Sequence, residues 1–254
     1  MKTHILHEAL HESPMPITIN LVGLGGNGLC MLNNLIKMHL TLRKLDHPGF
    51  QIRVYDPDIV EDHNVGRQMF SISDIGQPKV TAIIQRYLNN YGNKVQLADF
   101  AEEYTGQYPT NFTITCTDTV KSRIVIKDIL KRFPYDRNHN VQTIPLYWLD
   151  LGNTRRSGQF VLGTVNHEKD KKNNGQVYNL KDVFELYPSI KNVDDDEEPS
   201  CSLVESLGRQ DLFINPMLTG YASHMLWTLV KEEFITYQGM FVNLESLNVT
   251  SIKL

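Results

Sequence analysis

Short apolar stretches alternate with longer amphipathic segments along the first half of the chain. Four of the stretches have the length of a strand: the apolar start of 17–28, and 50–55, 95–100 and 111–117. Three further segments carry apolar residues three and four apart, the spacing of one helix face: Leu29–Leu45, Lys79–Tyr91 and Lys121–Phe133. Strands that alternate with helices predict βαβ units, and therefore a mostly parallel central sheet with helices on both faces.

After Thr143 the pattern changes to consecutive strands. Thr143–Leu151 and Ser157–Val165 are joined by the short segment 152–156, which predicts a hairpin. Gln210–Phe234 has the periodicity of an apolar helix, and Tyr237–Leu254 is predicted to form terminal strands. We therefore predict an α/β, Rossmann-like fold whose mostly parallel sheet is extended by antiparallel strands in the C-terminal half.

The chain is long enough for one α/β domain, and we assign residues 1–254 to a single domain. Met1–Pro16 is predicted to be an arm or short strand that packs outside the core. His4, His7 and His11 would share one face of a helix, for which a solvated face is preferred over a metal site. The region 166–200, with its acidic run 194–198, is predicted to be a mobile loop.

Composition narrows the possible partners and the location. The chain is 41% hydrophobic and 21% charged with a formal net charge of −4, which indicates neither nucleic acid nor an anionic membrane as the main partner. No apolar run approaches the roughly 20 residues that span a bilayer, and Met1–Pro14 is unlike a secretory signal. Three cysteines without a C-x-x-C pair predict neither a disulfide framework nor a structural zinc. We expect a reduced, cytoplasmic location.

The most informative stretch is Ile17–Gly28, in which an apolar strand breaks into a glycine-rich turn. Gly23, Gly25 and Gly28 occupy the positions of a G-x-G-x-x-G motif, with Gly26 between them. Missing side chains allow a tight turn and let a phosphate approach the backbone. The first N–H groups of the helix that follows add partial positive charge. The stretch predicts an anion site, for which a nucleotide is the preferred ligand.

Two acidic residues follow strands that would neighbour this glycine loop. Asp56 ends the strand 50–55, and Asp118 follows the strand 111–117. Ligands of open α/β sheets lie beyond the carboxyl ends of the strands, so one site can collect the loop and both carboxylates. Asp56 stands where a ribose hydroxyl is normally held. Lys79 lies near the positive end of its helix, where a bound phosphate would offset the unfavourable charge.

Together these segments resemble the E1-like adenylating enzymes, a family that includes ThiF, MoeB and the activating subunits for ubiquitin-like proteins. Within it, the chain is most similar to the ThiF-type proteins of plasmid-type gene clusters called PRTRC systems. The Arg-Gln…Asp-Ile-Gly-x-Pro-Lys run is far more specific than the glycine loop. The matching segments occur in the family's order: Gly23–Gly28, Asp56-Pro57-Asp58, Asn64–Gln68 with Phe70, Asp74–Lys79, and Thr117-Asp118 with Arg123.

The resemblance implies ATP-dependent adenylation of the C-terminal glycine of a ubiquitin-like or sulfur-carrier protein, which we call the carrier. It also implies a homodimer and Mg²⁺ as a cofactor, with Asp118 as the metal ligand. The reaction joins the carrier's terminal carboxylate to the α-phosphate of ATP and releases pyrophosphate.

The same resemblance assigns roles to individual residues. The glycine loop would approach the phosphates, and Asp56 would hold the ribose hydroxyls. Arg67 and Lys79, with Asp118, are the expected catalytic groups, because nucleotidyl transfer depends mainly on positioning and charge stabilisation. The expected nucleotide-binding set is Gly23, Gly25, Gly26, Gly28, Asp56, Asp58, Asn64, Arg67, Gln68, Lys79 and Asp118.

Cys201 is the candidate for thioester chemistry, because Pro199-Ser200-Cys201-Ser202 resembles the surroundings of the catalytic cysteine in some activating enzymes. The acidic run before it disfavours a thiolate unless the loop folds over the site. Cys30 and Cys116 are predicted to be core residues.

Two features depart from the family's pattern. No arginine precedes Arg43, so the N-terminal arginine that MoeB-type members present to the partner subunit's ATP has no counterpart. Arg155, Arg156 or Arg209 would have to replace it. The zinc-binding cysteine pairs common in the family are also absent from the sequence.

Two other functions stay open at this point. An NAD(P)-dependent Rossmann oxidoreductase would use the glycine loop and Asp56 but gives no role to Arg67, Lys79 and Asp118 together. A non-catalytic nucleotide-binding partner subunit would typically lack one of those three groups, and this chain keeps them all. We therefore prefer an active enzyme.

Overall fold

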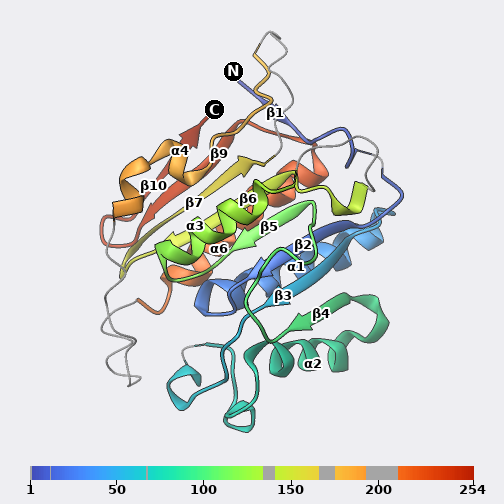
Figure 1. Cartoon of the computed structure of the whole chain (residues 1–254), viewed down its shortest axis with the longest axis vertical. Helices are drawn as coiled ribbons and strands as arrows, with labels where there is room; N and C mark the ends of the chain where they lie inside the picture. The colour runs from blue at the N-terminus through green and yellow to red at the C-terminus, as the bar shows by residue number, and fades with distance from the viewer. Residues whose placement is uncertain (1, 12, 67, 134–140, 166–174, 193–210) are drawn as a thin grey trace.

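The computed structural model describes residues 2–11, 13–66, 68–133, 141–165, 175–192 and 211–254. Within them an eight-stranded sheet runs through the molecule in the order β10-β9-β7-β6-β5-β2-β3-β4 (Figure 1). Its strands are β2 (Ile17–Val22), β3 (Phe50–Tyr55), β4 (Gln96–Phe100), β5 (Phe112–Thr115), β6 (Tyr147–Asn153), β7 (Ser157–Thr164), β9 (Tyr237–Asn243) and β10 (Asn248–Lys253).

Five of these strands form the parallel half of the sheet. β2 lies between β3 and β5, while β4 flanks β3 and β6 flanks β5. Every residue of β2 and β5 is buried, because helices cover both faces of this part of the sheet. The carboxyl ends of β2, β3 and β5 are therefore neighbours, and the glycine loop leaves the sheet at that edge.

The other half of the sheet is antiparallel. β6 and β7 form the predicted hairpin, and β9 and β10 extend the sheet beyond β7. The mostly parallel, Rossmann-like sheet with antiparallel strands in its C-terminal half is confirmed.

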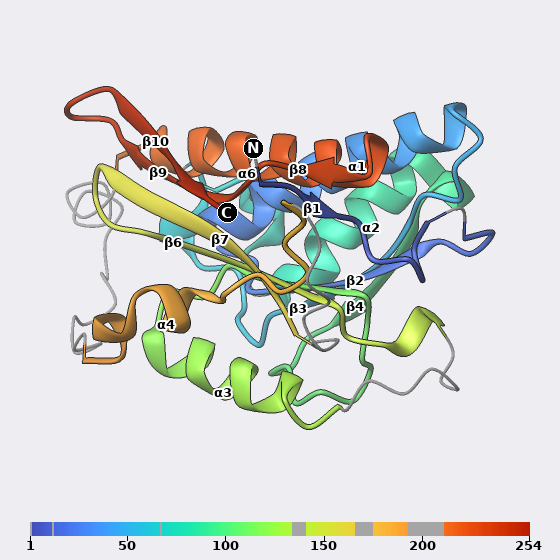
Figure 2. The same cartoon turned by 90° about the horizontal axis from the view of Figure 1, so that it is seen from above.

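Two groups of helices pack on opposite faces (Figure 2). α1 (Gly26–Lys44) and α6 (Ile214–Lys231) lie side by side on one face, and α2 (Lys79–Tyr91) contributes to the same apolar cluster. α3 (Val120–Leu130) and the short α4 (Val183–Leu186) cover the other face and share a second cluster. Short 3₁₀ segments lie at Asp62–Asn64, Ile72–Asp74, Gly92–Lys94, Val141–Thr143 and Pro188–Asn192.

The N-terminal arm differs from its prediction. β1 (His4–Ile5) pairs in antiparallel fashion with β8 (Phe234–Ile235), and Leu6 and Leu10 belong to the main apolar core. The expectation that Met1–Pro16 packs outside the core is therefore wrong, because its leucines are buried. His4 lies on a strand and is itself buried, so the solvated helical face predicted for the three histidines is also wrong.

Segment boundaries differ by a few residues elsewhere. β6 begins at Tyr147 rather than Thr143, since Pro145 and the 3₁₀ turn Val141–Thr143 precede it. The predicted loop region 166–200 includes α4 and Pro188–Asn192, and its remaining parts, 166–174 and 193–200, lie outside the described residues. None of the helices in the described ranges has the length and apolar character needed to cross a membrane.

Candidate functional site

The glycine loop is shaped by close backbone packing at two positions and is open at a third. Gly23 has φ +90°, and a Cβ there would lie 2.9 Å from the carbonyl oxygen of Cys116. A Cβ on Gly28 would lie 1.9 Å from the carbonyl oxygen of Gly23. By contrast, a Cβ on Gly25 would meet nothing within 4 Å. The first two glycines are required by the fold, whereas Gly25 leaves room for another molecule to reach the backbone.

The helix that follows begins without a cap. Gly25 is the N-cap residue of α1, no side chain caps the helix, and its first turn contains no acidic residue. The first N–H groups of a helix have no partner within it and carry partial positive charge. With open space at Gly25, this end of α1 can receive a phosphate.

Asp56 fastens the glycine loop to the end of β3. Its Oδ2 accepts a hydrogen bond from the Leu24 N–H at 2.5 Å, and its Oδ1 accepts one from the Asp58 N–H at 2.9 Å. Burial raises the pKa of the Asp56 carboxyl group, and the nearby Lys79 ammonium opposes that shift. Each carboxylate oxygen has a second lone pair, which can accept a hydrogen bond from a ribose hydroxyl as predicted.

Lys79 reaches the site from the start of α2. Its Nζ lies 2.7 Å from Asp58 Oδ2, and its backbone N–H donates to the Asp58 carbonyl at 3.0 Å. The Lys79 side chain is 10% exposed and that of Asp58 is 63% exposed, so the carboxylate faces solvent and the lysine does not. The Asp-Ile-Gly-Gln-Pro-Lys run holds this geometry, because Gly76 and Gln77 exchange backbone hydrogen bonds with Val60.

Asn64 and Gln68 belong to the loop that follows Asp58. Asn64 is buried, and its Oδ1 accepts a hydrogen bond from the Glu61 N–H at 2.9 Å. The Gln68 N–H donates to the Asn64 carbonyl, while Gln68 Oε1 is buried without a partner. Asn64 therefore shapes the loop, and Gln68 keeps an acceptor for another group. Arg67 and Cys201 lie outside the described residues.

Asp118 lies on the other side of the glycine loop, between β5 and α3. Its side chain is exposed. Gly23 packs against Cys116 and the backbone nitrogen of Thr117, the residue before Asp118. The structure therefore brings the loop, Asp56, Asp58 and Lys79 into one chain of contacts, and brings Asp118 to the edge of the same loop.

This arrangement has relatives among known proteins. A family model described as the ThiF family matches residues 8–226. The chain belongs to the ThiF family. The fold is similar to those of E. coli MccB with ATP, of E. coli MccB with MccA, and of PaaA. No curated protein matches the chain.

The structural similarities are clear in shape and low in sequence identity. The MccB–ATP structure has a TM-score of 0.59 and 13% identity, and covers 96% of this chain and 66% of that one. For MccB with MccA the values are 0.58, 13%, 97% and 66%, and for PaaA they are 0.57, 14%, 97% and 65%. This ThiF-family chain thus spans less than two thirds of the length of those proteins.

A buried ion pair beneath Asp118 was not predicted as such. Arg123 Nε lies 3.5 Å from Asp150 Oδ1, and its Nη2 donates to the carbonyls of Thr117 and Leu151 at 3.3 Å. Thr115 Oγ1 donates to Asp150 Oδ1 at 2.7 Å. Burial raises the pKa of the Asp150 carboxyl group, and Arg123 opposes the shift. In this ThiF-family fold the pair ties together the ends of β5 and β6.

Three asparagines at or beside the start of α1 were also missed. Asn27 Nδ2 donates to Asn153 Oδ1 at 2.7 Å, and Asn215 packs against Gly26. They come from the start of α1, the end of β6 and the start of α6. The position of Asn27 within the glycine-rich stretch could have identified it from the sequence. No sequence motif surrounds Asn153 or Asn215 that could have identified them.

The two cysteines in the described ranges differ in burial. Cys116 is part of the main core, as predicted, and Cys30 is half-buried. Burial raises the pKa of both thiols, which disfavours the nucleophilic thiolate.

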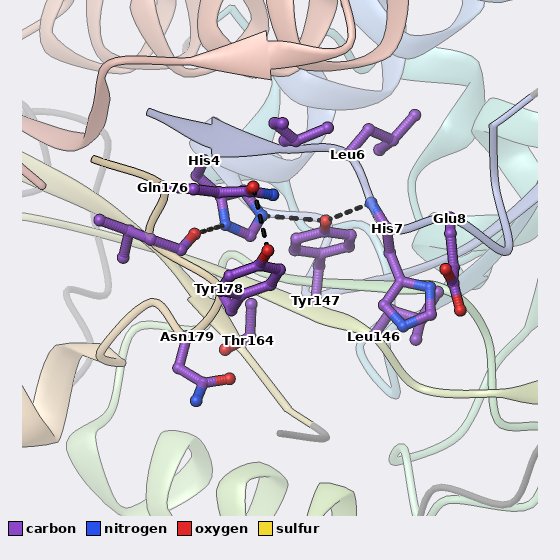
Figure 3. A pocket seen from close by; sticks show the side chains of 12 residues that line it. His4, Leu6, His7, Glu8, Leu146, Tyr147, Thr164, Gln176, Tyr178 and Asn179 are labelled. Atoms are coloured by element: carbon purple, nitrogen blue, oxygen red, sulfur yellow. Dashed lines mark hydrogen bonds between the residues drawn. The ribbon is translucent and has the colours of Figure 1, made fainter. Parts of the chain in front are cut away.

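A cavity of about 280 Å³ lies at the opposite edge of the sheet, between the N-terminal arm and the start of β6 (Figure 3). His4 links two residues that line this cavity. Its Nδ1 lies 2.8 Å from the Val177 carbonyl oxygen, and its Nε2 lies 3.0 Å from the Tyr147 hydroxyl oxygen. The Tyr147 oxygen also accepts the His7 N–H at 2.9 Å. A neutral His4 that donates from Nδ1 and accepts at Nε2 satisfies this network. None of the predicted nucleotide-binding residues lines this cavity.

Proposed function

We propose that this protein uses ATP to adenylate the terminal carboxylate of a protein or peptide substrate, with a ubiquitin-like or sulfur-carrier protein as the preferred class. The observation that carries the proposal is the convergence of the glycine loop, Asp56, Asp58 and Lys79 at the carboxyl ends of adjacent strands in a ThiF-family chain. ATP and a peptide, MccA, accompany the structurally similar MccB in its solved structures.

The nucleotide half of the site has the required chemistry. The uncapped start of α1 and the open backbone at Gly25 can receive the phosphates. Lys79 supplies a point charge close to them, and Asp56 holds the loop that cradles them. Arg67, in the segment outside the described residues, would add forked contacts to the triphosphate. These groups stabilise charge that develops as pyrophosphate departs.

Mg²⁺ fits the exposed carboxylate of Asp118. Magnesium favours oxygen ligands and retains several waters, so one carboxylate together with substrate phosphates is a sufficient donor set. No cluster of three or more metal-ligating side chains occurs in the part of the chain that the structure describes. When bound, the metal would neutralise phosphate charge, and Arg123 would fix the backbone on which Asp118 stands.

Three further parts of the proposal come from the family resemblance. Cys201 would accept the activated carrier as a thioester after adenylation, with release of AMP. The protein would act as a homodimer, in which Arg155, Arg156 or Arg209 replaces the missing N-terminal arginine. Its expected location is cytoplasmic.

Nucleotide selectivity is the first test. Isothermal titration calorimetry should show binding of MgATP and no comparable binding of NAD⁺ or NADP⁺. Lys79→Met should weaken MgATP binding at least about tenfold, because it removes a charged contact to phosphate. Preferential binding of a nicotinamide dinucleotide would reject the adenylating function in favour of the oxidoreductase.

The reaction itself is tested by ATP–pyrophosphate exchange with small glycine-terminated proteins from the source cell. Asp118→Ala should abolish exchange while leaving the unfolding transition unchanged. Asp128→Ala, an exposed aspartate on α3, is the matched control and should keep full exchange. Unchanged exchange in Asp118→Ala would refute the role of Asp118.

Cys201→Ser should keep exchange but lose any reducible carrier adduct.

A further inference from the structure

Asp118 is held in place through its backbone alone. In the ranges that the structure describes, its exposed side chain forms no hydrogen bond and no ion pair. It stands between the end of β5 and Thr119, the N-cap residue of α3. The direction of the Asp118 carboxylate therefore depends on the orientation of the peptide bond before it.

Arg123, one turn into α3, fixes that peptide bond. Its Nη2 donates at 3.3 Å to the Thr117 carbonyl, which belongs to the peptide bond before Asp118. The same Nη2 donates to the Leu151 carbonyl, also at 3.3 Å. Gly152 makes room for these contacts, because a Cβ there would lie 2.5 Å from Arg123 Nη2 and 2.7 Å from Nη1. The guanidinium thus links the peptide bond of Asp118 to the end of β6.

Asp150 in turn orients the guanidinium. Its Oδ1 lies 3.5 Å from Arg123 Nε and accepts the Thr115 hydroxyl at 2.7 Å. Thr115 Oγ1 accepts the Trp148 indole N–H at 3.0 Å, and the three residues Thr115, Trp148 and Asp150 are at most 2% exposed. Since a guanidinium is a rigid planar fork, holding its Nε sets the direction of its Nη2. A buried chain of contacts therefore runs from the sheet to the peptide bond of Asp118.

Stability alone does not account for this pair. A buried ion pair stabilises a fold little or not at all compared with apolar side chains of similar size, because both charges lose their hydration. α3 is also fastened by a second ion pair, in which Lys127 Nζ lies 2.5 Å from Asp182 Oδ2. An apolar pair in place of Arg123 and Asp150 could not donate a hydrogen bond to the Thr117 carbonyl.

We propose that Arg123 and Asp150 are positioning residues for the adenylation reaction. Asp150 orients the guanidinium of Arg123, and Arg123 sets the direction in which the Asp118 carboxylate meets Mg²⁺. The inference rests on the proposed function, in which Asp118 is the metal ligand. It goes further, because it makes metal recognition depend on two side chains that are themselves buried.

The test compares two affinities of the full chain by isothermal titration calorimetry. One is the affinity for the ATP analogue AMPCPP with Mg²⁺, and the other is the affinity for AMPCPP with EDTA. Their ratio, the metal preference, reports the contact to the metal and does not respond to a uniform change in nucleotide binding. The wild type should show a metal preference of at least about tenfold, and Asp118→Ala should remove most of it.

Arg123→Met/Asp150→Asn separates positioning from folding. This double variant leaves neither charge of the pair in the core, and its asparagine keeps an oxygen for the Thr115 hydroxyl. It should fold, bind metal-free AMPCPP as tightly as the wild type does, and lose about tenfold in metal preference. Arg123→Lys is a milder second variant. It keeps a positive charge beside Asp150 but not the fork that reaches the Thr117 carbonyl, so it should also lose metal preference.

Lys127→Met/Asp182→Asn is the matched control. It removes another ion pair of α3 and leaves the hydrogen bond to the Thr117 carbonyl in place, so it should keep the wild-type metal preference. Adding Asp118→Ala to the first double variant should cause no further loss of preference, because a positioning residue acts only through the group that it positions.

The outcomes distinguish this inference from the proposed function. A wild-type metal preference in Arg123→Met/Asp150→Asn would overturn the inference, and so would an equal loss in the Lys127→Met/Asp182→Asn control. If the wild type binds AMPCPP without a metal preference, the inference fails together with the metal-binding role of Asp118, while nucleotide binding itself is upheld. If AMPCPP binds in neither form, the proposed function fails, and the inference with it.

Discussion

The two edges of the parallel sheet are built in opposite ways. At the carboxyl edge, charges and open helix ends gather: Asp56 and Lys79 flank the glycine loop, and a buried Arg123–Asp150 pair lies beneath Asp118. At the amino edge, His4 and Tyr147 join the N-terminal arm to β6 through neutral hydrogen bonds. The 280 Å³ cavity is at the amino edge, whereas the groups of the proposed nucleotide site are at the carboxyl edge.

The difference teaches that a cavity can belong to the packing of a fold and need not mark the site of the proposed reaction. The wall of the amino-edge cavity contains a polar network whose partners satisfy one another, which is how a fold fastens a terminal segment. At the carboxyl edge, by contrast, the buried charges of Asp56 and Arg123 have partners within the fold. The side chains of Asp58 and Asp118 are exposed, and the start of α1 is uncapped. If this contrast is correct, substitutions at the two edges should separate stability from nucleotide binding.

The largest effect is expected from Arg123→Met at the carboxyl edge. The Asp150 side chain is 1% exposed, so removal of Arg123 leaves a buried carboxylate without its counter-charge. Breaking such a pair from one side typically costs about 3–5 kcal/mol of unfolding free energy, measured by urea denaturation. The double variant Arg123→Met/Asp150→Asn should lose less than Arg123→Met alone, because no unpaired charge remains. A loss below about 1 kcal/mol in the single variant would contradict the structural role of the pair.

Tyr147→Phe is the corresponding change at the amino edge. It removes the hydroxyl that serves both His4 Nε2 and the His7 N–H, so two polar groups lose their partner. The expected cost is about 1–3 kcal/mol of unfolding free energy. MgATP affinity should stay at the wild-type value, as calorimetry can show. A large loss of nucleotide affinity in this stably folded variant would mean that the two edges are coupled.

The sequence predicted the carboxyl edge better than the amino edge, for a physical reason. The glycine loop, Asp56 and Asp118 are marked by local patterns, and the rule that ligands lie beyond the ends of parallel strands is enough to bring them together. The His4–Tyr147 contact joins residues 143 apart in the chain, and the Asn27–Asn153 contact joins residues 126 apart. Single-sequence periodicity carries no information on such pairs.

The pairing of Lys79 with Asp58 shows an intermediate case. The motif placed both residues in the site, but only the backbone hydrogen bonds of Gly76, Gln77 and Val60 determine that they face each other. The prediction for the N-terminal arm was wrong for a different reason. Its three histidines suggested a polar face, whereas its two buried leucines determine how it packs.

The pH dependence of stability sharpens the contrast at His4. Burial lowers the pKa of His4 below its ordinary value, with opposition from the hydrogen bond to Val177. The unfolded chain therefore binds a proton first as pH falls below about 6.5, and the folded state loses stability through that range until its own pKa is passed. Above about 6.5 the contribution is fully present.

The measurement is the unfolding free energy between about pH 5 and 8 for wild type and His4→Gln. Burial also lowers the pKa of His39 and His47, so only the difference between the two proteins isolates His4. The decline on acidification should be shallower in His4→Gln. His224→Gln, which replaces an exposed histidine on α6, is the matched control for the substitution itself. Parallel curves for wild type and His4→Gln would show that His4 does not titrate differently on folding.

The smallest effect is expected from Asp58→Asn. This variant tests whether the Lys79–Asp58 pair contributes less to the unfolding free energy than the buried Arg123–Asp150 pair does. The Asp58 side chain is 63% exposed, so water screens its 2.7 Å contact with Lys79. The Asp56 carboxylate also remains near the buried lysine when Asp58 loses its charge. Exposed pairs contribute about 0–1 kcal/mol, and the amide of the variant would still present an oxygen to the lysine. Urea denaturation should therefore place this variant within about 1 kcal/mol of wild type, several-fold less than Arg123→Met. If Asp58→Asn destabilised the protein as much as Arg123→Met, the Lys79–Asp58 pair would be part of the structural foundation of the edge. Its lysine would then be held in place for the fold, and a role in binding phosphate would need support independent of this geometry.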